Sequence, residues 1–101
     1  MVGWNPVGQR FETEEFVGQV EQALRNILTV LKEANGNPEH IVRLAWFVTN
    51  REEYLESLPQ LGQAYRAVMG THYPAMSVVA VSGLIEGLAK VEIEATAVVP
   101  D

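Results

Sequence analysis

The sequence contains no cysteine among its 101 residues. Disulfide bonds, thiolate catalysis and zinc sites with cysteine ligands are therefore excluded. No apolar run approaches the ~18 residues that cross a bilayer, and the first residues lack the basic and apolar regions of a signal peptide. We therefore expect a cytoplasmic protein with no membrane partner.

Basic residues are few and scattered. The chain has seven Lys and Arg against thirteen Asp and Glu, a net charge of −6. Nucleic acids and anionic membranes both attract proteins through clustered basic residues, so we expect no nucleic-acid partner. Hydrophobic residues make up 48% of the chain, which excludes a disordered protein. The length fits a single domain, residues 1–101.

Signature motifs of several enzyme classes are also missing. The sequence contains no G-x-S-x-G or S-x-x-K nucleophile motif and no G-x-G-x-x-G phosphate loop. The two histidines, His40 and His72, have no metal ligand at suitable spacing on the same expected element. We interpret His40 as an exposed residue before a strand, and His72 as a loop residue that packs or is solvated. We therefore expect no metal site and no cofactor.

Apolar residues recur every three or four positions from Phe16 onward, which is the spacing of one helix face. This periodicity predicts a helix over residues 14–34. Thr13 is the expected N-cap, and Asn35-Gly36 is a typical left-handed stop.

A second helical region follows, in which Thr49 and Glu52 fit a capping box. Pro59 would break a helix interior. The sequence therefore predicts a short turn and then a helix over residues 58–69, which Gly70 ends.

Three segments have the pattern of strands: residues 41–49, 75–81 and 88–99. In the first, alternation places Val42 with Leu44 on one face and Ile41 on the other, and both faces are apolar enough to need cover. The first two strands bracket a helix, and the last two are expected to form a hairpin. The sequence therefore predicts an α+β fold with a mixed sheet and helices on one face.

Glu92 and Glu94 lie two residues apart on the last expected strand, so their side chains point the same way. One interpretation is a solvated polar face beside Lys90. The other is that an oligomer covers this face and leaves a carboxylate in a cleft, where burial would suit it to acid or base catalysis. Spacing alone leaves both interpretations open.

Three stretches carry motifs that are specific in their order and spacing. They are residues 22–36 with Q-A-L-R-N-I and an Asn-Gly stop, residues 41–54 with F-V-T, and Y-P-A-M-S-V-V at 73–79 followed by V-E-I-E-A-T-A at 91–97. Together they resemble the RidA family, also called YjgF and formerly L-PSP endoribonuclease. The resemblance covers about residues 14–99.

This resemblance implies a chorismate-mutase-like fold, with two helices packed on one face of a mixed β-sheet. It also implies a homotrimer whose sheets face inward, with small-molecule clefts between subunits. The family's best-known activity hydrolyses 2-imino acids, such as 2-iminobutanoate and 2-iminopropanoate, to 2-oxo acids and ammonia. In that reaction an arginine in P-A-R-[ST] holds the substrate carboxylate, and a glutamate in V-E-I-E positions the water or proton.

Carried over to this sequence, the catalytic glutamate is Glu92, and the substrate-binding positions are Met76, Ser77 and Val78. The arginine position is Met76, whose thioether cannot pair with a carboxylate. Losing such a charged hydrogen bond costs about 2–5 kcal/mol. Arg43 could replace the arginine only if the fold brings it to the cleft.

The beginning of the chain also departs from the family pattern. The resemblance implies that relatives carry an N-terminal strand pair before the position of Gly3-Trp4, and this sequence opens there, as if at the end of a strand. We expect a fold that lacks this hairpin.

Two functions from different classes follow from these departures. One is a hydrolase that acts, through Glu92, on a metabolite other than a free 2-imino acid. The other is a non-catalytic trimer that binds a metabolite or partner in its clefts. Imino-acid hydrolysis is the third alternative.

Overall fold

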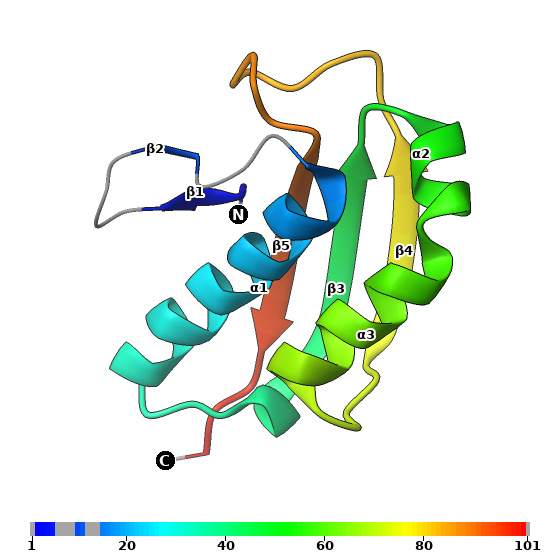
Figure 1. The fold of residues 1–101 in the computed structure, drawn as a ribbon. Helices are drawn as coiled ribbons and strands as arrows, with labels where there is room; N and C mark the ends of the chain where they lie inside the picture. Colours follow the sequence, from blue (N-terminus) through cyan, green and yellow to red (C-terminus); the bar gives the residue numbers. More distant parts are fainter. Residues whose placement is uncertain (1, 6–9, 12–14, 101) are drawn as a thin grey trace.

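The structure is a computed structural model that describes residues 2–5, 10–11 and 15–100. Two helices cross the front of a three-stranded sheet, and a short strand pair lies beside them (Figure 1). In chain order the elements are β1 (Trp4–Asn5), β2 (Arg10–Phe11), α1 (Phe16–Glu33), the 3-10 turn η1 (Pro38–His40), β3 (Ile41–Val48), α2 (Arg51–Glu56), α3 (Leu58–Met69), β4 (Ala75–Ala80) and β5 (Val91–Ala97).

Helix α1 agrees with the apolar periodicity of its sequence. Its first residue, Phe16, and the residues three or four positions apart that follow it are buried. Asn35 adopts a φ of 60°, the expected left-handed stop. The residue at the N-cap position is Glu15, and the expected cap, Thr13, lies outside the described residues.

The second helical region begins one residue later than its capping pattern predicts. Asn50, and not Thr49, is the N-cap of α2, because its side chain accepts a hydrogen bond of 2.9 Å from the backbone N–H of Glu53. Asn is as good a cap as Thr or better. The expected break before Pro59 is confirmed, since α3 begins at Leu58. Its last residue, Met69, is followed by the expected Gly70, which has a φ of 67°.

The strand order is β4–β3–β5, so the expected hairpin between the last two strands is wrong. β4 pairs with β3 in parallel and β5 pairs with it antiparallel. The loop between β4 and β5 passes over the end of β3 (Figure 1). Both outer strands therefore pair with the apolar middle strand, and the sheet is mixed as predicted.

A register shift between Ile41 and Arg43 changes which residues of β3 face the helices. Ile41 is buried with Leu44 and Trp46, while Val42 is exposed. The strict alternation expected for this strand is therefore wrong at its start, because an irregularity of this kind inserts one residue and reverses the faces before it.

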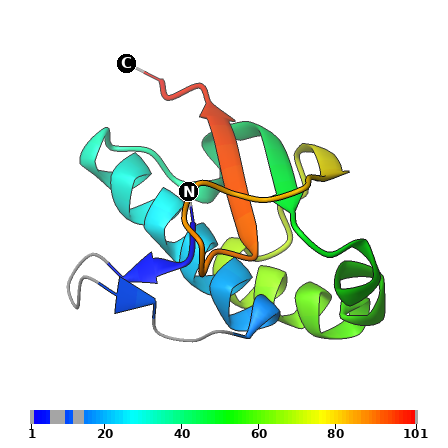
Figure 2. The same cartoon turned by 90° about the horizontal axis from the view of Figure 1, so that it is seen from above.

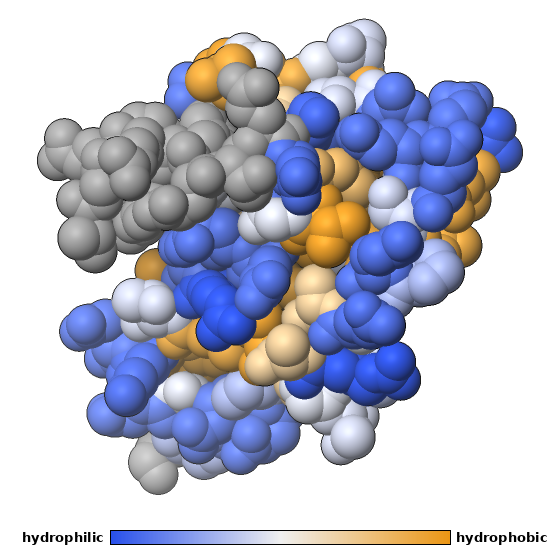
Figure 3. All heavy atoms as spheres, in the orientation of Figure 1, coloured by the Kyte–Doolittle hydropathy of each residue, from blue (hydrophilic) through white to orange (hydrophobic). Residues whose placement is uncertain are grey.

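All helices lie on the same side of the sheet (Figure 2). The core forms between α1, α3 and the helix-facing side chains of the strands, and its apolar residues show between α1 and α3 (Figure 3). Among the described residues nothing covers the opposite side, which we call the open face, so the expected cover on both faces of β3 is not met within one chain. None of the described helices combines the length and apolarity needed to span a membrane.

The start of the described chain docks against α1 and β5. Val2 forms an antiparallel bridge with Glu92, and β1 pairs with β2 over two residues. A Cβ on Gly3 would lie 2.7 Å from the Cα of Gln19, closer than packed atoms allow. Only glycine therefore lets the two backbones meet here.

Candidate functional site

Glu92, the predicted catalytic residue, lies on the open face of the sheet. It pairs with Phe47 of β3, while its neighbours Val91 and Ile93 are fully buried under the helices. Its side chain is partly buried, and Glu94 lies on the same face opposite Ala45 and is exposed. The two carboxylates thus share a face, as their spacing predicted.

Met76 lies on the other side of the sheet. It pairs with Leu44, which is buried under the helices, and is itself 39% exposed on the edge strand β4. Because alternate residues of a strand point to opposite faces, the side chains of Met76 and Glu92 are on opposite faces of one chain. A single subunit does not bring these two predicted site residues together.

A cavity of about 210 Å³ lies beside Met76, and we call it the Trp46 hollow. It opens between the edge strand β4 and the α2–α3 region. The described residues that line it carry no charge. They include Trp46, Tyr54, Tyr65, Tyr73, Met76 and Val78.

The remaining predicted binding residues divide between the two faces. Val78 pairs with Trp46 and faces the helices, while Ser77 pairs with Ala45 and lies on the open face. Arg43 is also on the open face, four residues from Phe47, the partner of Glu92. Four residues of strand span about 13 Å. Arg43 pairs with Ala75, the neighbour of Met76, but on the opposite face of the sheet from Met76, so within one subunit it does not lie where the missing arginine would.

Two aromatic rings form one wall of the Trp46 hollow. The rings of Tyr65 and Tyr73 are stacked, with centroids 5.0 Å apart and an interplanar angle of 18°. The Tyr65 hydroxyl donates a hydrogen bond of 2.6 Å to the backbone oxygen of His72. Burial of this hydroxyl, reinforced by the neighbouring Tyr73, raises the pKa of Tyr65 to about 12, so it remains a neutral donor.

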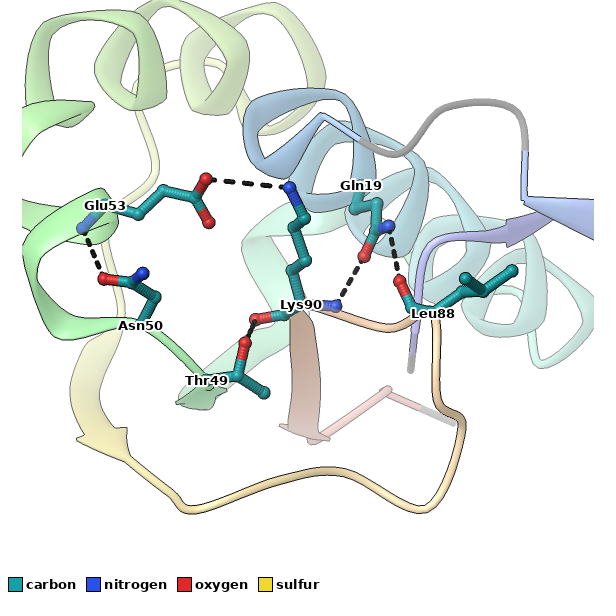
Figure 4. Close-up of polar contacts among 6 residues, drawn as sticks. All are labelled: Gln19, Thr49, Asn50, Glu53, Leu88 and Lys90. Atoms are coloured by element: carbon teal, nitrogen blue, oxygen red, sulfur yellow. Dashed lines mark hydrogen bonds and ion pairs between the residues drawn. The ribbon is translucent and has the colours of Figure 1, made fainter.

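Gln19 of α1 holds the chain just before the Glu92 strand (Figure 4). It is fully buried, its side-chain nitrogen donates 2.9 Å to the Leu88 oxygen, and its side-chain oxygen accepts 2.7 Å from the Lys90 N–H. One buried amide thus binds the backbone groups of the residues before and after Ala89. This fixes the entry of β5, and with it the placement of Glu92.

Lys90 is also tied to the end of β3 and to α2 (Figure 4). Its backbone oxygen accepts hydrogen bonds from the Thr49 N–H at 3.1 Å and from the Thr49 hydroxyl at 3.4 Å. Its ammonium lies 3.6 Å from a Glu53 carboxylate oxygen. Lys90 therefore links the entry of β5 to the end of β3 and to α2.

The two histidines have structural contacts. The ring Nδ1 of His40 accepts a hydrogen bond of 2.9 Å from the Asn37 N–H and so closes η1. His72 Nε2 lies 2.7 Å from the Ile41 oxygen, and because a carbonyl only accepts, this nitrogen carries the proton. The part of the chain that the structure describes has no group of three His, Asp or Glu side chains able to hold a metal.

Comparison with known proteins decides the family. The model of the family described as "Endoribonuclease L-PSP" matches residues 1–99. The chain belongs to the RidA/YjgF/L-PSP family. Among solved structures of the family, this RidA-family chain is similar to YyfA of Yersinia pestis, with 34% identity and a TM-score of 0.82 over 98% of the chain.

RidA of the Antarctic bacterium Psychrobacter sp. PAMC 21119 is another relative, with 28% identity and a TM-score of 0.79 over 94% of this RidA-family chain. A Lactococcus lactis protein named "Putative regulator AldR" is 28% identical over 93 residues, or 92% of the chain. The chain is shorter than these relatives. It spans 75% of the YyfA chain, 72% of the Psychrobacter chain and 70% of the AldR sequence.

Sequence reasoning missed two residues of this RidA-family site. Gln19 interrupts the apolar face of α1, one position before Val20, and a polar residue at a core position is a signal that it holds a buried partner. The sequence indicated a site role for Trp46 even less clearly, because a large aromatic residue on a strand usually belongs to the hydrophobic core. Only the structure shows that it lines a hollow.

Proposed function

We propose that this protein is a homotrimeric, small-molecule-binding member of the RidA family that does not hydrolyse free 2-imino acids. The observation that carries the proposal is the uncharged lining of the Trp46 hollow around Met76. A 2-imino acid carries a carboxylate, and a desolvated carboxylate needs a charged partner such as the bidentate fork of arginine. A thioether favours a neutral ligand instead.

The open face of the sheet supports the trimer. Val79 of β4 is 47% exposed there and pairs with Phe47, so apolar side chains lie on a face that no described element covers. A three-stranded sheet with apolar residues on both faces needs cover on both. The family resemblance supplies the occupant, since it implies that three sheets face inward and form clefts between subunits.

A trimer would also bring together residues that one chain keeps apart. Glu92 on the open face of one subunit and the β4 edge of the next could then line a single cleft. The similarity to a protein named "Putative regulator AldR" supports ligand binding without turnover, because a regulator responds to a ligand that it need not transform.

A second candidate is a hydrolase that acts on a neutral metabolite. It is favoured by the firm placement of Glu92, whose strand is fixed at its entry by Gln19 and at its edge by the Val2 bridge. A carboxylate held in a closed cleft could position water or move a proton. Cleavage of RNA is not proposed, because the seven basic residues form no cluster for phosphates.

The test measures hydrolysis of 2-iminopropanoate, generated in solution, with and without the purified protein. We expect no acceleration above the uncatalysed rate. Acceleration that Glu92→Gln abolishes would overturn the proposal and establish the deaminase.

A pair of variants tests whether a cation at position 76 is what binds a substrate carboxylate. Met76→Arg restores the cation, so we expect it to bind a 2-oxo acid such as pyruvate at least ten-fold more tightly than the unmodified protein. Val30→Arg adds the same charge at an exposed position of α1, which does not line the hollow, and is the control. Equal gains in both variants would mean that any added cation suffices, and that position 76 is not the carboxylate position.

A further inference from the structure

The outer edge of β5 is paired along only part of its length. β5 is the last strand in the order β4–β3–β5, so one side of it faces β3 and the other side is an edge of the sheet. Among the described residues, this edge is bridged at one point, where Val2 pairs antiparallel with Glu92. An unpaired strand edge is a template on which a further strand can add. The stretch from Glu94 to Ala97 offers such an edge.

The direction of the backbone groups along this stretch follows from the pairing with β3. The Lys90 oxygen accepts a hydrogen bond of 3.1 Å from the Thr49 N–H at the end of β3. In an antiparallel pair, successive residues direct their backbone groups alternately toward the partner strand and away from it. Every second residue from Lys90 therefore bonds to β3, including Glu94, which pairs with Ala45. Ala95 directs its N–H and C=O outward, where an added strand can exchange two hydrogen bonds with it.

A groove of about 490 Å³ lies between this edge and α1, and we call it the β5 groove. Ile27 and Val30 line it from the helix, where α1 diverges from β5 (Figure 1). Ala95 pairs with the buried Leu44 and so faces the helix side, yet its side chain is exposed. Both Ala95 and Ala97 are too short to fill the space beside the helix, and Val30 is 57% exposed. Large apolar side chains on an added strand would fill this space and leave water.

The β5 groove is short, because other parts of the chain bound it at both ends. Val2 occupies the edge opposite Glu92. At the other end the chain after β5 turns toward the end of α1, since a Cβ built on Gly36 would lie 3.0 Å from the Val99 side chain. The four residues of strand between these ends span about 13 Å. The groove therefore fits an extended segment of four or five residues.

The rim of the groove on the open face is acidic. Glu94 lines the groove and is exposed, and among the described residues no cation lies within ion-pair distance of it. Arg43 shares the open face but belongs to β3, so β5 lies between it and an added strand. A second copy of the chain would bring its own net charge of −6. Opposite charges on neighbouring strands stabilise their pairing, so the rim favours a basic partner.

We propose that the β5 edge binds an extended segment of a partner protein in which large apolar residues alternate with Lys or Arg. The segment runs antiparallel to β5, as Val2 does, and places its apolar side chains in the groove opposite Ala95 and Ala97. Its basic side chains lie on the open-face side, one of them opposite Glu94. This inference goes beyond the proposed function, because the Trp46 hollow lies at the other edge of the sheet, beside β4.

The probe is the peptide acetyl-Lys-Ile-Lys-Ile-Lys-amide, which is titrated into the ¹⁵N-labelled full chain and followed by two-dimensional NMR. In the expected register its second isoleucine lies opposite Ala95. We expect the Ala95 amide resonance to move downfield and to saturate at or below about 1 mM peptide. Hydrogen exchange of the same amide should slow at least five-fold at saturation, because its N–H gains an acceptor.

Two N-methylated peptides test whether the backbone of the segment pairs with β5. Methylation of the second isoleucine removes the N–H that donates to the Ala95 oxygen, so this peptide should bind at least about five-fold more weakly. Methylation of the middle lysine changes an N–H that points away from β5. This matched peptide should bind within about two-fold of the parent peptide.

A pair of charge reversals tests the basic partner. Glu94→Lys places a cation opposite a lysine of the peptide, and we expect about ten-fold weaker binding. Glu56→Lys makes the same change of charge at an exposed position of α2 and is the control. It should change the affinity less than two-fold. Circular dichroism checks that both variants fold, and sedimentation equilibrium checks that both keep the mass of the parent protein.

The inference is overturned if the Ala95 resonance does not saturate, if the two N-methylated peptides bind equally, or if Glu94→Lys and Glu56→Lys bind alike. A fall in sedimenting mass when the peptide is added would assign the edge to a second copy of the chain and would also overturn it. Hydrolysis of 2-iminopropanoate is measured without any peptide, so failure of the proposed function is a separate outcome.

Discussion

Gln19 shows how one buried amide can position a site on another element. It belongs to α1, yet its side-chain hydrogen bonds to the Leu88 oxygen and from the Lys90 N–H reach the chain on either side of Ala89, just before β5. A buried amide without partners is costly, and so are the backbone groups that its removal leaves unpaired. Its value to the fold is therefore greater than that of a surface glutamine.

We predict that Gln19→Leu lowers the free energy of unfolding by about 2 kcal/mol, because the Lys90 N–H loses its acceptor and the Leu88 oxygen must turn to water. The measurement is urea denaturation, with amide hydrogen exchange at Lys90 and Val91 as a local readout. Gln63→Leu, at an exposed position of α3, is the control and should change stability by less than about 0.5 kcal/mol. Equal effects of the two variants would contradict the role assigned to Gln19.

Tyr65 gives the protein an expected dependence on high pH. Its pKa is raised to about 12 in the folded chain, against 10.0 in an unfolded one. Between these values the unfolded chain loses a proton that the folded chain keeps, so stability is complete below pH 10 and falls as the pH rises toward 12. We predict that Tyr65→Phe removes this part of the decline. Denaturation curves from pH 8 to 11.5 measure it, and parallel declines in the two proteins would contradict it.

At the scale of elements, α2 depends on a cap that the sequence pattern misplaces by one residue. We predict that Asn50→Ala destabilises the protein by about 1 kcal/mol, because the Glu53 N–H loses its side-chain acceptor. Asn50→Asp keeps an acceptor and adds a charge that the helix dipole favours, so it should retain full stability. Thermal unfolding distinguishes the two, and an unchanged melting temperature in Asn50→Ala would contradict the cap.

The pairing of the strands has a consequence for how the site is built. Since β3 lies between β4 and β5, the positions of Met76 and Glu92 are separated by the width of the middle strand as well as by the sheet itself. A hairpin of the last two strands would have placed them on neighbouring strands. The observed order makes any joint site of these residues a property of more than one subunit.

At the scale of the whole molecule, the open face is where we expect copies of the chain to meet. We predict that Val79→Glu converts a trimer into monomers, because a carboxylate buried without a partner in an interface costs several kcal/mol. Leu55→Glu is the control, since Leu55 is 48% exposed, close to the 47% of Val79, but lies on α2, on the helix side. Sedimentation equilibrium measures the mass. Retention of the trimer in Val79→Glu would move the interface elsewhere, and a monomeric parent protein would contradict the assembly.

Local patterns were sufficient to predict most of the elements. The three- and four-residue period placed α1, Pro59 and Gly70 bounded α3, and alternation of apolar residues located β3, β4 and β5. These features depend on the order of residues within a few turns or a single strand. The start of α2 was missed by one residue, because Thr49 and Asn50 are both good caps and only their backbone geometry distinguishes them.

By itself, the sequence determined an acidic chain without cysteine, the α+β class, the family resemblance and the absence of a cation at position 76, because these depend on residue identity and local period. Only the tertiary structure decided that β3 is the middle strand, that Ile41 turns inward, that Gln19 holds β5 and that Trp46 lines an uncharged hollow. Each of these is a contact between residues far apart in the chain. Such contacts are selected by the packing of the whole core, which no single stretch of sequence encodes.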